Sequence, residues 1–209
     1  MITHHPDPSS LMSCSAGSMP EPLAAVMATH ISLCPLCRKQ LENFDCLGTL
    51  MFNSLPPTQM ASTRAEASLA EPDVARRPCS RGDLPDAVVE VLRPTGKPLP
   101  WRRMGLGLWI LPIALSDGVD GKLTLVKVAP GVAIPEHGHS ASELTVILDG
   151  AYTDEIGTFR VGDVSDIDDT VAHRPVACPK LGCVCLTATE GRSRFKSLLA
   201  RLIAPLAGF

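Results

Sequence analysis

The sequence lacks the features that would place a protein in a membrane or on a nucleic acid. No stretch approaches the roughly 18–20 consecutive apolar residues that a bilayer-spanning helix requires. Residues 1–6 contain neither a basic nor an apolar segment, so a secretory signal peptide is not indicated. The formal net charge is −3, which excludes a general polyanion-binding surface. We therefore expect a cytoplasmic protein with no membrane partner and no direct nucleic-acid partner.

The composition is that of a folded globular protein. Of the 209 residues, 45% are hydrophobic and 20% are charged, and this length suits one ordinary domain or two small ones. Eight cysteines are present. Disulfide frameworks are rare in a reducing cytosol, so metal or redox roles are expected for these thiols. Cys14 is one candidate ligand, whereas Cys46 is expected in a core.

The N-terminal quarter has the apolar spacing of helices. Apolar residues recur at an approximate helical period over 21–37 and again over 41–51. Pro35 follows Cys34 at a position that proline favours in the first turn of a helix. Residues 57–71 contain helix formers with only a thin apolar face, so a helix there would need a partner to dock on.

The rest of the chain changes character twice. A stretch rich in proline and charge is typical of a linker, and short strand-like segments cut by glycine and proline follow it, which favours an all-β sandwich or barrel. The clearest of these segments are 123–128, 143–148 and 183–187. The predicted fold class is α+β with several domains: a small helical bundle at 1–71, a linker at 72–85 and a β domain at 86–209.

The six histidines fall into two clusters, and the first one is joined to a C-x-x-C motif. His30 lies four residues before Cys34, hence on the same face of a helix, and Cys34 and Cys37 can offer two thiolates to one ion. Tetrahedral Zn²⁺ prefers such donors, and His5 or His4 can supply the fourth if the first helix returns antiparallel. The other interpretations are a chance pair of buried thiols and a redox motif, although no βαβ pattern surrounds it.

The second cluster lies in a strand-like segment between glycines. His137 and His139 are two residues apart, so on a strand both side chains face the same way, and Glu143 has the same parity. His173 follows thirty residues after Glu143 and can close the site from a neighbouring strand. Three histidines and a glutamate serve Fe, Mn, Ni or Zn, so the ligand types do not select the metal. The alternative is a pair of surface histidines in a loop.

Two family resemblances rest on these clusters. The segment Gly131–Gly150 matches the first cupin motif, G-x5-H-x-H-x3-E-x6-G, at every position, and the second cupin motif is partly present with His173 as its ligand. The pattern His-x3-Cys-x2-Cys at 30–37 resembles the signature of the zinc-binding anti-sigma domain. Joined in one chain, the two resemble the ChrR-type anti-sigma factors, which consist of a zinc-binding helical bundle and a cupin β-barrel.

The resemblance implies a regulator and not an enzyme. Its N-terminal module would bind an extracytoplasmic-function sigma factor, and its cupin would respond to the oxidative stress that singlet oxygen or organic peroxide causes. The implied metal ligands are His5, His30, Cys34 and Cys37 for Zn²⁺, and His137, His139, Glu143 and His173 for Zn²⁺ or another divalent metal. The alternative is a cupin metalloenzyme such as a dioxygenase with an accessory zinc module, for which Glu136 and the pair Asp154–Glu155 are the acid/base candidates near the motif.

The helical module has more apolar residues than three short helices can bury. An exposed apolar stripe normally marks a binding face, so we expect this one to meet the partner or a second copy of the chain. The residues expected on that face are Leu23, Met27, Leu47, Met51 and Phe52.

Overall fold

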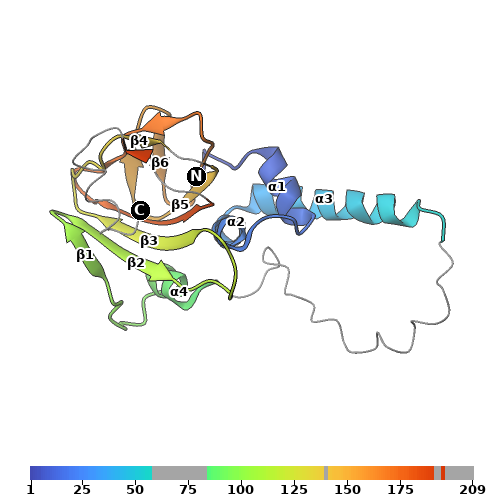
Figure 1. The fold of residues 1–209 in the computed structure, drawn as a ribbon, viewed down its shortest axis with the longest axis horizontal. Coiled ribbons are helices and arrows are strands. Elements are labelled where there is room, and N and C mark those ends of the chain that lie inside the picture. The colour runs from blue at the N-terminus through green and yellow to red at the C-terminus, as the bar shows by residue number, and fades with distance from the viewer. Residues whose placement is uncertain (58–83, 139–140, 191–193, 196–209) are drawn as a thin grey trace.

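The computed structural model describes residues 1–57, 84–138 and 141–190, together with the backbone of 194–195. In these ranges a group of N-terminal helices lies against one side of a β-barrel (Figure 1). The helix expected at 57–71 and the linker expected at 72–85 fall almost entirely outside the described residues, as does His139. The described helices include none that is long and apolar enough to cross a bilayer.

The second and third of the three N-terminal helices are those that the apolar spacing predicted. Asp7 caps the first, because its side chain accepts a hydrogen bond from the backbone N–H of Ser9. Cys34 ends the second and caps the third: its backbone is extended, and its Sγ accepts from the N–H of Cys37. Pro35 occupies the first turn, as expected. The helices are α1 (Pro8–Ser15), α2 (Glu21–Leu33) and α3 (Pro35–Asn53).

The expectation of strands directly from residue 86 was wrong, because a short helix comes first. Helix α4 (Asp86–Leu92) follows Pro85 and buries Val88 completely in the core that the sheet also forms. Seven residues contain fewer than two helical turns of apolar pattern, which is too little for periodicity to separate a helix from a strand.

The strands form two antiparallel sheets. The larger has the order β1-β2-β3-β10-β5-β6, with β7 and β9 also paired to β5, and the smaller has the order β11-β4-β8. The strands of the larger sheet are β1 (Arg102–Gly105), β2 (Leu108–Ile113), β3 (Lys122–Val128), β5 (Glu143–Thr153), β6 (Thr158–Arg160), β7 (Val164–Ile167), β9 (Val176–Ala177) and β10 (Cys183–Thr189). Those of the smaller sheet are β4 (His137–Gly138), β8 (Ala172–His173) and β11 (Arg194–Phe195).

One hydrophobic core joins the helices to the barrel. Helix α2 packs on β3, β5 and β10, and its buried residues belong to the same cluster as those of the sheet. Leu23 and Met27, which the sequence placed on the partner-binding face, are 5% and 1% exposed because the sheet covers them. That expectation was wrong, since burial between a helix and a sheet far away in sequence leaves no separate mark in helical periodicity.

The distal half of α3 projects away from this body (Figure 1). Leu47, Met51 and Phe52 are 51%, 63% and 74% exposed, as the sequence predicted. Cys46 is exposed on the same helix, so its expected place in the core was wrong. Among the described residues of α3, Leu41 and Phe44 are the last that pack against the hydrophobic core, and Cys46 follows them.

Candidate metal centres

The four residues of the first predicted cluster come together in the structure. His5, His30, Cys34 and Cys37 place their ligand atoms within 4.8 Å of one another. His5 Nδ1 lies 3.5 Å from Cys34 Sγ and 3.3 Å from Cys37 Sγ. The two imidazole rings meet edge to face, with their centroids 5.8 Å apart. We call this group the His/Cys centre.

Three chain segments build the His/Cys centre. His30 stands in the last turn of α2, and Cys34 and Cys37 open α3, so the break between the two helices brings these donors together. His5 arrives on the N-terminal segment 2–7, which runs along β7 of the barrel: the N–H of Val164 donates to the carbonyl of His4 at 3.2 Å. The sequence left His4 and His5 open as the fourth ligand, and the structure brings His5 into the group.

The His/Cys centre has the chemistry of a buried zinc site. Cys34 and Cys37 are 1% and 2% exposed, and burial together with the neighbouring Cys34 thiol raises the pKa of Cys37 to about 12. Burial also lowers the pKa of His30, so the ring is neutral. Its Nδ1 donates to the carbonyl of Gly162 at 2.7 Å, so the lone pair is on Nε2, which has no hydrogen-bond partner among the described residues. A buried lone pair beside two thiols fits a Zn²⁺ ion.

The second predicted cluster also assembles, within the described residues, as His137, Glu143 and His173. Their ligand atoms lie within 4.8 Å of one another, and their residues are 8%, 6% and 2% exposed. His137 and His173 are directly opposite each other on β4 and β8, with ring centroids 4.7 Å apart, and Glu143 begins β5. We call this group the barrel centre. The placement of His139 is outside the described residues.

Both histidines of the barrel centre are oriented by a hydrogen bond at Nδ1. His137 Nδ1 donates to the carbonyl of Pro135 at 2.9 Å, and His173 Nδ1 lies 2.9 Å from Asp154 Oδ2. A carbonyl or carboxylate oxygen can only accept, so Nδ1 of each ring carries a proton and Nε2 is the nitrogen that can offer a lone pair to a metal ion. This is the usual arrangement of a metal-binding histidine, whose second nitrogen donates to an oxygen behind it.

Burial sets the protonation of the barrel centre. It lowers the pKa of His137 to about 4, with the nearby His173 adding to the effect, and it raises the pKa of Glu143 to about 7. A divalent cation would favour the ionised carboxylate of Glu143 and would use the neutral imidazoles as donors. The donor set therefore fits a divalent metal, and its nitrogen and oxygen atoms do not specify which one.

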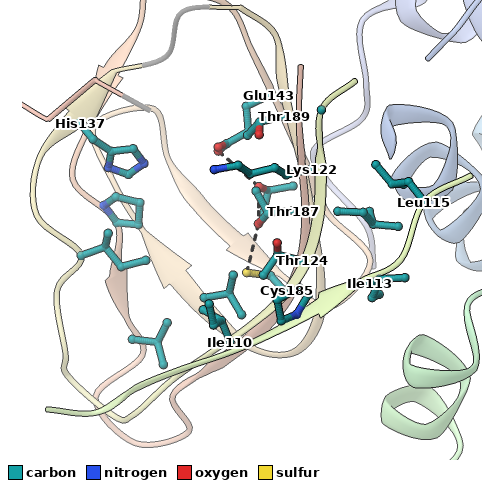
Figure 2. A pocket seen from close by; sticks show the side chains of 18 of the residues that line it. Ile110, Ile113, Leu115, Lys122, Thr124, His137, Glu143, Cys185, Thr187 and Thr189 are labelled. Carbon is teal, nitrogen blue, oxygen red and sulfur yellow. Dashed lines mark hydrogen bonds between the residues drawn. The ribbon is translucent and has the colours of Figure 1, made fainter. Parts of the chain in front are cut away.

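A cavity of about 730 Å³ adjoins the barrel centre. Figure 2 shows His137 on one wall, with Glu143, Thr187 and Cys185 on the other. Cys183 and Cys185 are two residues apart on β10, so their side chains lie on the same face of the strand. Both line the cavity, and both belong to the second hydrophobic cluster of the barrel. The space is large enough for a small organic molecule beside the three donors.

Two buried carboxylates support ligands of these centres, a role that the sequence did not predict for either of them. Asp154, considered from the sequence only as an acid/base candidate, binds His173. Asp163 is fully buried and accepts hydrogen bonds from the N–H groups of Thr3 and His4, the residues directly before His5. The Asp-x-x-Gly pattern at 154–157 signals a turn, but contacts across 19 and about 160 residues leave no local sequence signal.

The comparisons with known proteins agree with both halves of this architecture. Residues 92–191 match the protein family described as the ChrR cupin-like domain. The anti-sigma-E factor ChrR of Cereibacter sphaeroides is 33% identical over 210 residues, which is 98% of this chain and 97% of that protein. A chain in the crystal structure of Rhodobacter sphaeroides SigE in complex with the anti-sigma ChrR superposes with a TM-score of 0.72 and 31% identity, over 90% of this chain and 99% of that one.

The matches to the two ChrR chains cover the helices as well as the barrel. They confirm the predicted combination of a helical module with a cupin and exclude a chance joining of two unrelated motifs. The protein belongs to the ChrR family of anti-sigma factors.

Proposed function

We propose that this protein binds and inhibits an extracytoplasmic-function sigma factor and releases it in response to oxidative stress. The observation that carries the proposal is the apolar stripe of α3, in a chain whose relative was crystallised with SigE. Leu47, Leu50 and Met51 follow the i, i+3, i+4 spacing of one helix face and are 51%, 68% and 63% exposed. A contiguous face of this kind is typical of a helix that docks into an apolar groove of a partner.

The His/Cys centre supports this binding face as a structural zinc site. Its four donors come from the N-terminal segment, α2 and α3, so a Zn²⁺ ion there would tie the base of α3 to the rest of the module. Two sulfur and two nitrogen donors would complete the tetrahedral shell that Zn²⁺ takes in structural sites, which leaves no open position for a substrate. Zinc binding contributes folding free energy on the order of 10 kcal/mol in small zinc peptides, which is enough to hold a short helical module together.

The barrel centre is the candidate sensor. His137, Glu143 and His173, with His139 added from the sequence motif, would hold Zn²⁺ or another divalent metal beside the cavity. Small oxidants can reach such a site, and the two cavity thiols of Cys183 and Cys185 lie on the adjoining wall. The metal would supply a charged, ligand-exchanging centre, while the protein residues supply its orientation and its dry surroundings.

The remaining assignments follow from the sigma partner. We place the protein in the cytoplasm, where a sigma factor acts. The proposed domain division is 1–71, 72–85 and 86–209, with the first and last docked through α2.

A metal-dependent enzyme is the second candidate, because a cavity of about 730 Å³ beside three metal-type donors is also what a cupin dioxygenase needs. Oxygen consumption by the protein reconstituted with Fe²⁺, in the presence of candidate organic substrates, would distinguish turnover from sensing.

Binding to an extracytoplasmic-function sigma factor of the same organism, such as one encoded beside this gene, provides the direct test. Co-expressed with the full chain, that sigma factor should elute as a 1:1 complex, and the double variant Leu50→Asp/Met51→Asp should weaken binding by 30-fold or more, on the order expected for interface anchors. Leu181→Asp is the matched control, because Leu181 is 72% exposed but lies on the barrel. Failure to form the complex, or wild-type affinity in the double variant, would refute the proposal.

A further inference from the structure

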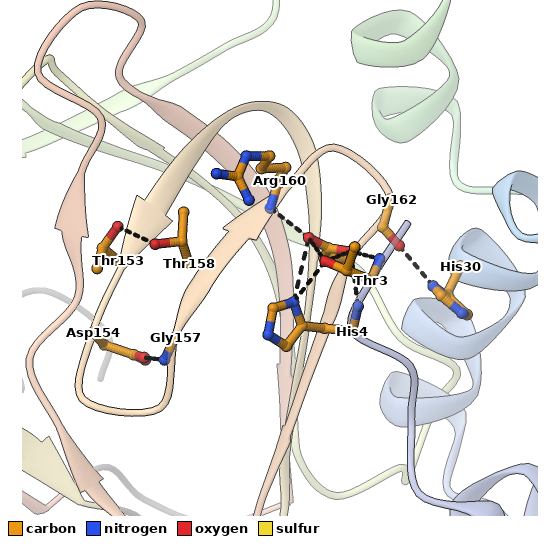
Figure 3. A network of polar contacts seen from close by, with 10 residues as sticks. Thr3, His4, His30, Thr153, Asp154, Gly157, Thr158, Arg160 and Gly162 are labelled. Atoms are coloured by element: carbon orange, nitrogen blue, oxygen red, sulfur yellow. Dashed lines mark hydrogen bonds and ion pairs between the residues drawn. The ribbon is translucent and has the colours of Figure 1, made fainter. Parts of the chain in front are cut away.

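One short segment of the barrel touches both candidate metal centres. It runs from Asp154, just after β5, through β6 to Asp163, just before β7 (Figure 3). We call residues 154–163 the bridging segment. Neither Asp154 nor Asp163 belongs to a ligand set, yet each is a fully buried carboxylate side chain that contacts a ligand or the chain next to one.

At one end, the bridging segment supports the barrel centre. Asp154 Oδ2 accepts from His173 Nδ1 at 2.9 Å, and the two side chains are 0% and 3% exposed. Asp154 Oδ1 accepts from the backbone N–H groups of Ile156 and Gly157 at 2.9 and 3.1 Å. The carboxylate is therefore held by the turn that it closes, and a shift of this turn moves the imidazole of His173.

At the other end, the bridging segment supports the His/Cys centre. The carbonyl of Gly162 accepts from His30 Nδ1 at 2.7 Å. Asp163 Oδ1 accepts from the N–H groups of Thr3 and His4 at 2.6 and 3.0 Å, which fixes the chain immediately before His5. Because the N–H of Arg160 donates to Oδ2 of the same carboxylate at 2.8 Å, the hold on the N-terminal segment depends on the geometry of the turn at 160–163.

The two ends are in packed contact with each other. The ring of His4 lies on Phe159, with centroids 4.4 Å apart, and approaches Gly157 so closely that a Cβ there would be 3.1 Å from its Nε2. Phe159 in turn stacks on Tyr152, which lines the cavity beside the barrel centre, at 5.0 Å between centroids. A displacement at Asp154 or in the cavity wall therefore meets His4 directly, and no flexible stretch separates the two ends.

We propose that the bridging segment is an outer shell shared by the two centres, so that metal occupancy of the barrel centre changes the metal affinity of the His/Cys centre. Asp154 is the positioning residue for His173, and Asp163 is the positioning residue for His5. Such outer-shell groups commonly change metal affinity 10- to 100-fold, and coupling between two sites is reciprocal. The inference rests on the proposed metal binding, and it provides a physical route by which an event in the barrel loosens the helices that hold the partner.

Cobalt substitution in the full-length protein tests the proposal. Of the two ligand sets, only the His/Cys centre contains thiolates, so a thiolate-to-cobalt charge-transfer band reports that centre and should disappear in Cys34→Ser/Cys37→Ser. The affinity for Co²⁺ is measured from this band against a competing chelator. If the wild type shows no such band, or the band survives in the double variant, the zinc assignment of the proposed function fails, independently of any coupling.

Two groups of variants then test the bridging segment. Asp163→Asn should weaken the Co²⁺ affinity reported by the band at least about 10-fold. Thr3→Pro should do the same, because it removes a hydrogen-bond donor to Asp163 without altering the buried carboxylate. His137→Ala removes a ligand of the barrel centre, and Asp154→Asn weakens the support of His173. Neither changes a ligand of the His/Cys centre, yet both should shift the affinity reported by the band at least about 5-fold. Asp168→Asn is the matched control, because Asp168 caps a turn through the N–H of Thr170 in the same way and is in neither ligand set.

The outcomes are distinct. Circular dichroism of the metal-free variants shows whether each one is folded. If Asp163→Asn does not fold, Thr3→Pro still tests the same hydrogen bonds. Unchanged affinity in both Asp163→Asn and Thr3→Pro would refute the positioning role, and unchanged affinity in both His137→Ala and Asp154→Asn would refute the coupling. Shifts in both groups, with Asp168→Asn like the wild type, support the proposal.

Discussion

Met27 and Met51 provide a matched test of how the helices are joined to the barrel. Both are helical methionines of the N-terminal module, but Met27 is 1% exposed in the core shared with the sheet, whereas Met51 is 63% exposed on α3. Truncating a buried methionine to alanine removes its transfer free energy and leaves a cavity, at a cost of about 2–5 kcal/mol. Truncating an exposed one changes stability by about 0.5 kcal/mol or less.

We therefore expect Met27→Ala to lower the free energy of unfolding by about 3 kcal/mol, which corresponds to about 6–12 °C in Tm for a protein of this size. Met51→Ala should leave Tm close to that of the wild type and weaken sigma-factor binding instead. The assay is thermal and urea unfolding of the metal-free protein, followed by circular dichroism, together with a binding titration at a temperature where both variants are folded. Equal Tm values for the two variants would refute the shared core, and a larger binding loss in Met27→Ala would refute the partner-binding role of α3.

Three further predictions follow from the two centres and from the turn that joins them. Zinc affinity of the His/Cys centre should rise with pH near neutrality, because burial keeps the Cys37 thiol protonated, with a pKa of about 12, and Zn²⁺ must displace that proton. Chelator competition at two pH values one unit apart should show about a tenfold change in zinc affinity for each proton released, and an affinity that does not change with pH would contradict the assignment. Glu143→Gln should abolish metal retention in the barrel centre while leaving zinc in the His/Cys centre, as metal analysis of the purified variant would show, whereas retention of two metals would remove Glu143 from the ligand set. Gly162→Ala should lower the free energy of unfolding by about 1–2 kcal/mol, since Gly162 has φ +88° and an added Cβ would come within 2.6 Å of Ile2. Tm should fall accordingly, and an unchanged Tm would show that the N-terminal segment is not packed on this turn.

Local patterns in the sequence predicted the helices and the clearest strands correctly. The apolar period over 21–37 and 41–51 became α2 and α3, with the break at Cys34 and Pro35 where proline chemistry placed it. Helix α4 was missed because its apolar pattern is shorter than two turns.

Long-range contacts decided what local patterns could not. Leu23 and Met27 carry the same helical pattern as Met51, and only the sheet packed over them separates core from surface. The choice of His5 over His4 depends on how the N-terminal segment lies along β7.

The sequence by itself determined the kinds of donor atoms and the two groups in which they lie, because ligand spacing at i, i+2, i+3 and i+4 follows directly from strand and helix geometry. It also determined the family, since both motifs occur in one chain. The tertiary structure decided which histidine completes the His/Cys centre, which apolar face remains for a partner, and that Asp154 and Asp163 support the two centres from one segment. Those features depend on pairings between residues up to about 160 positions apart, and such pairings are set by the packing of the whole chain and not by any local period.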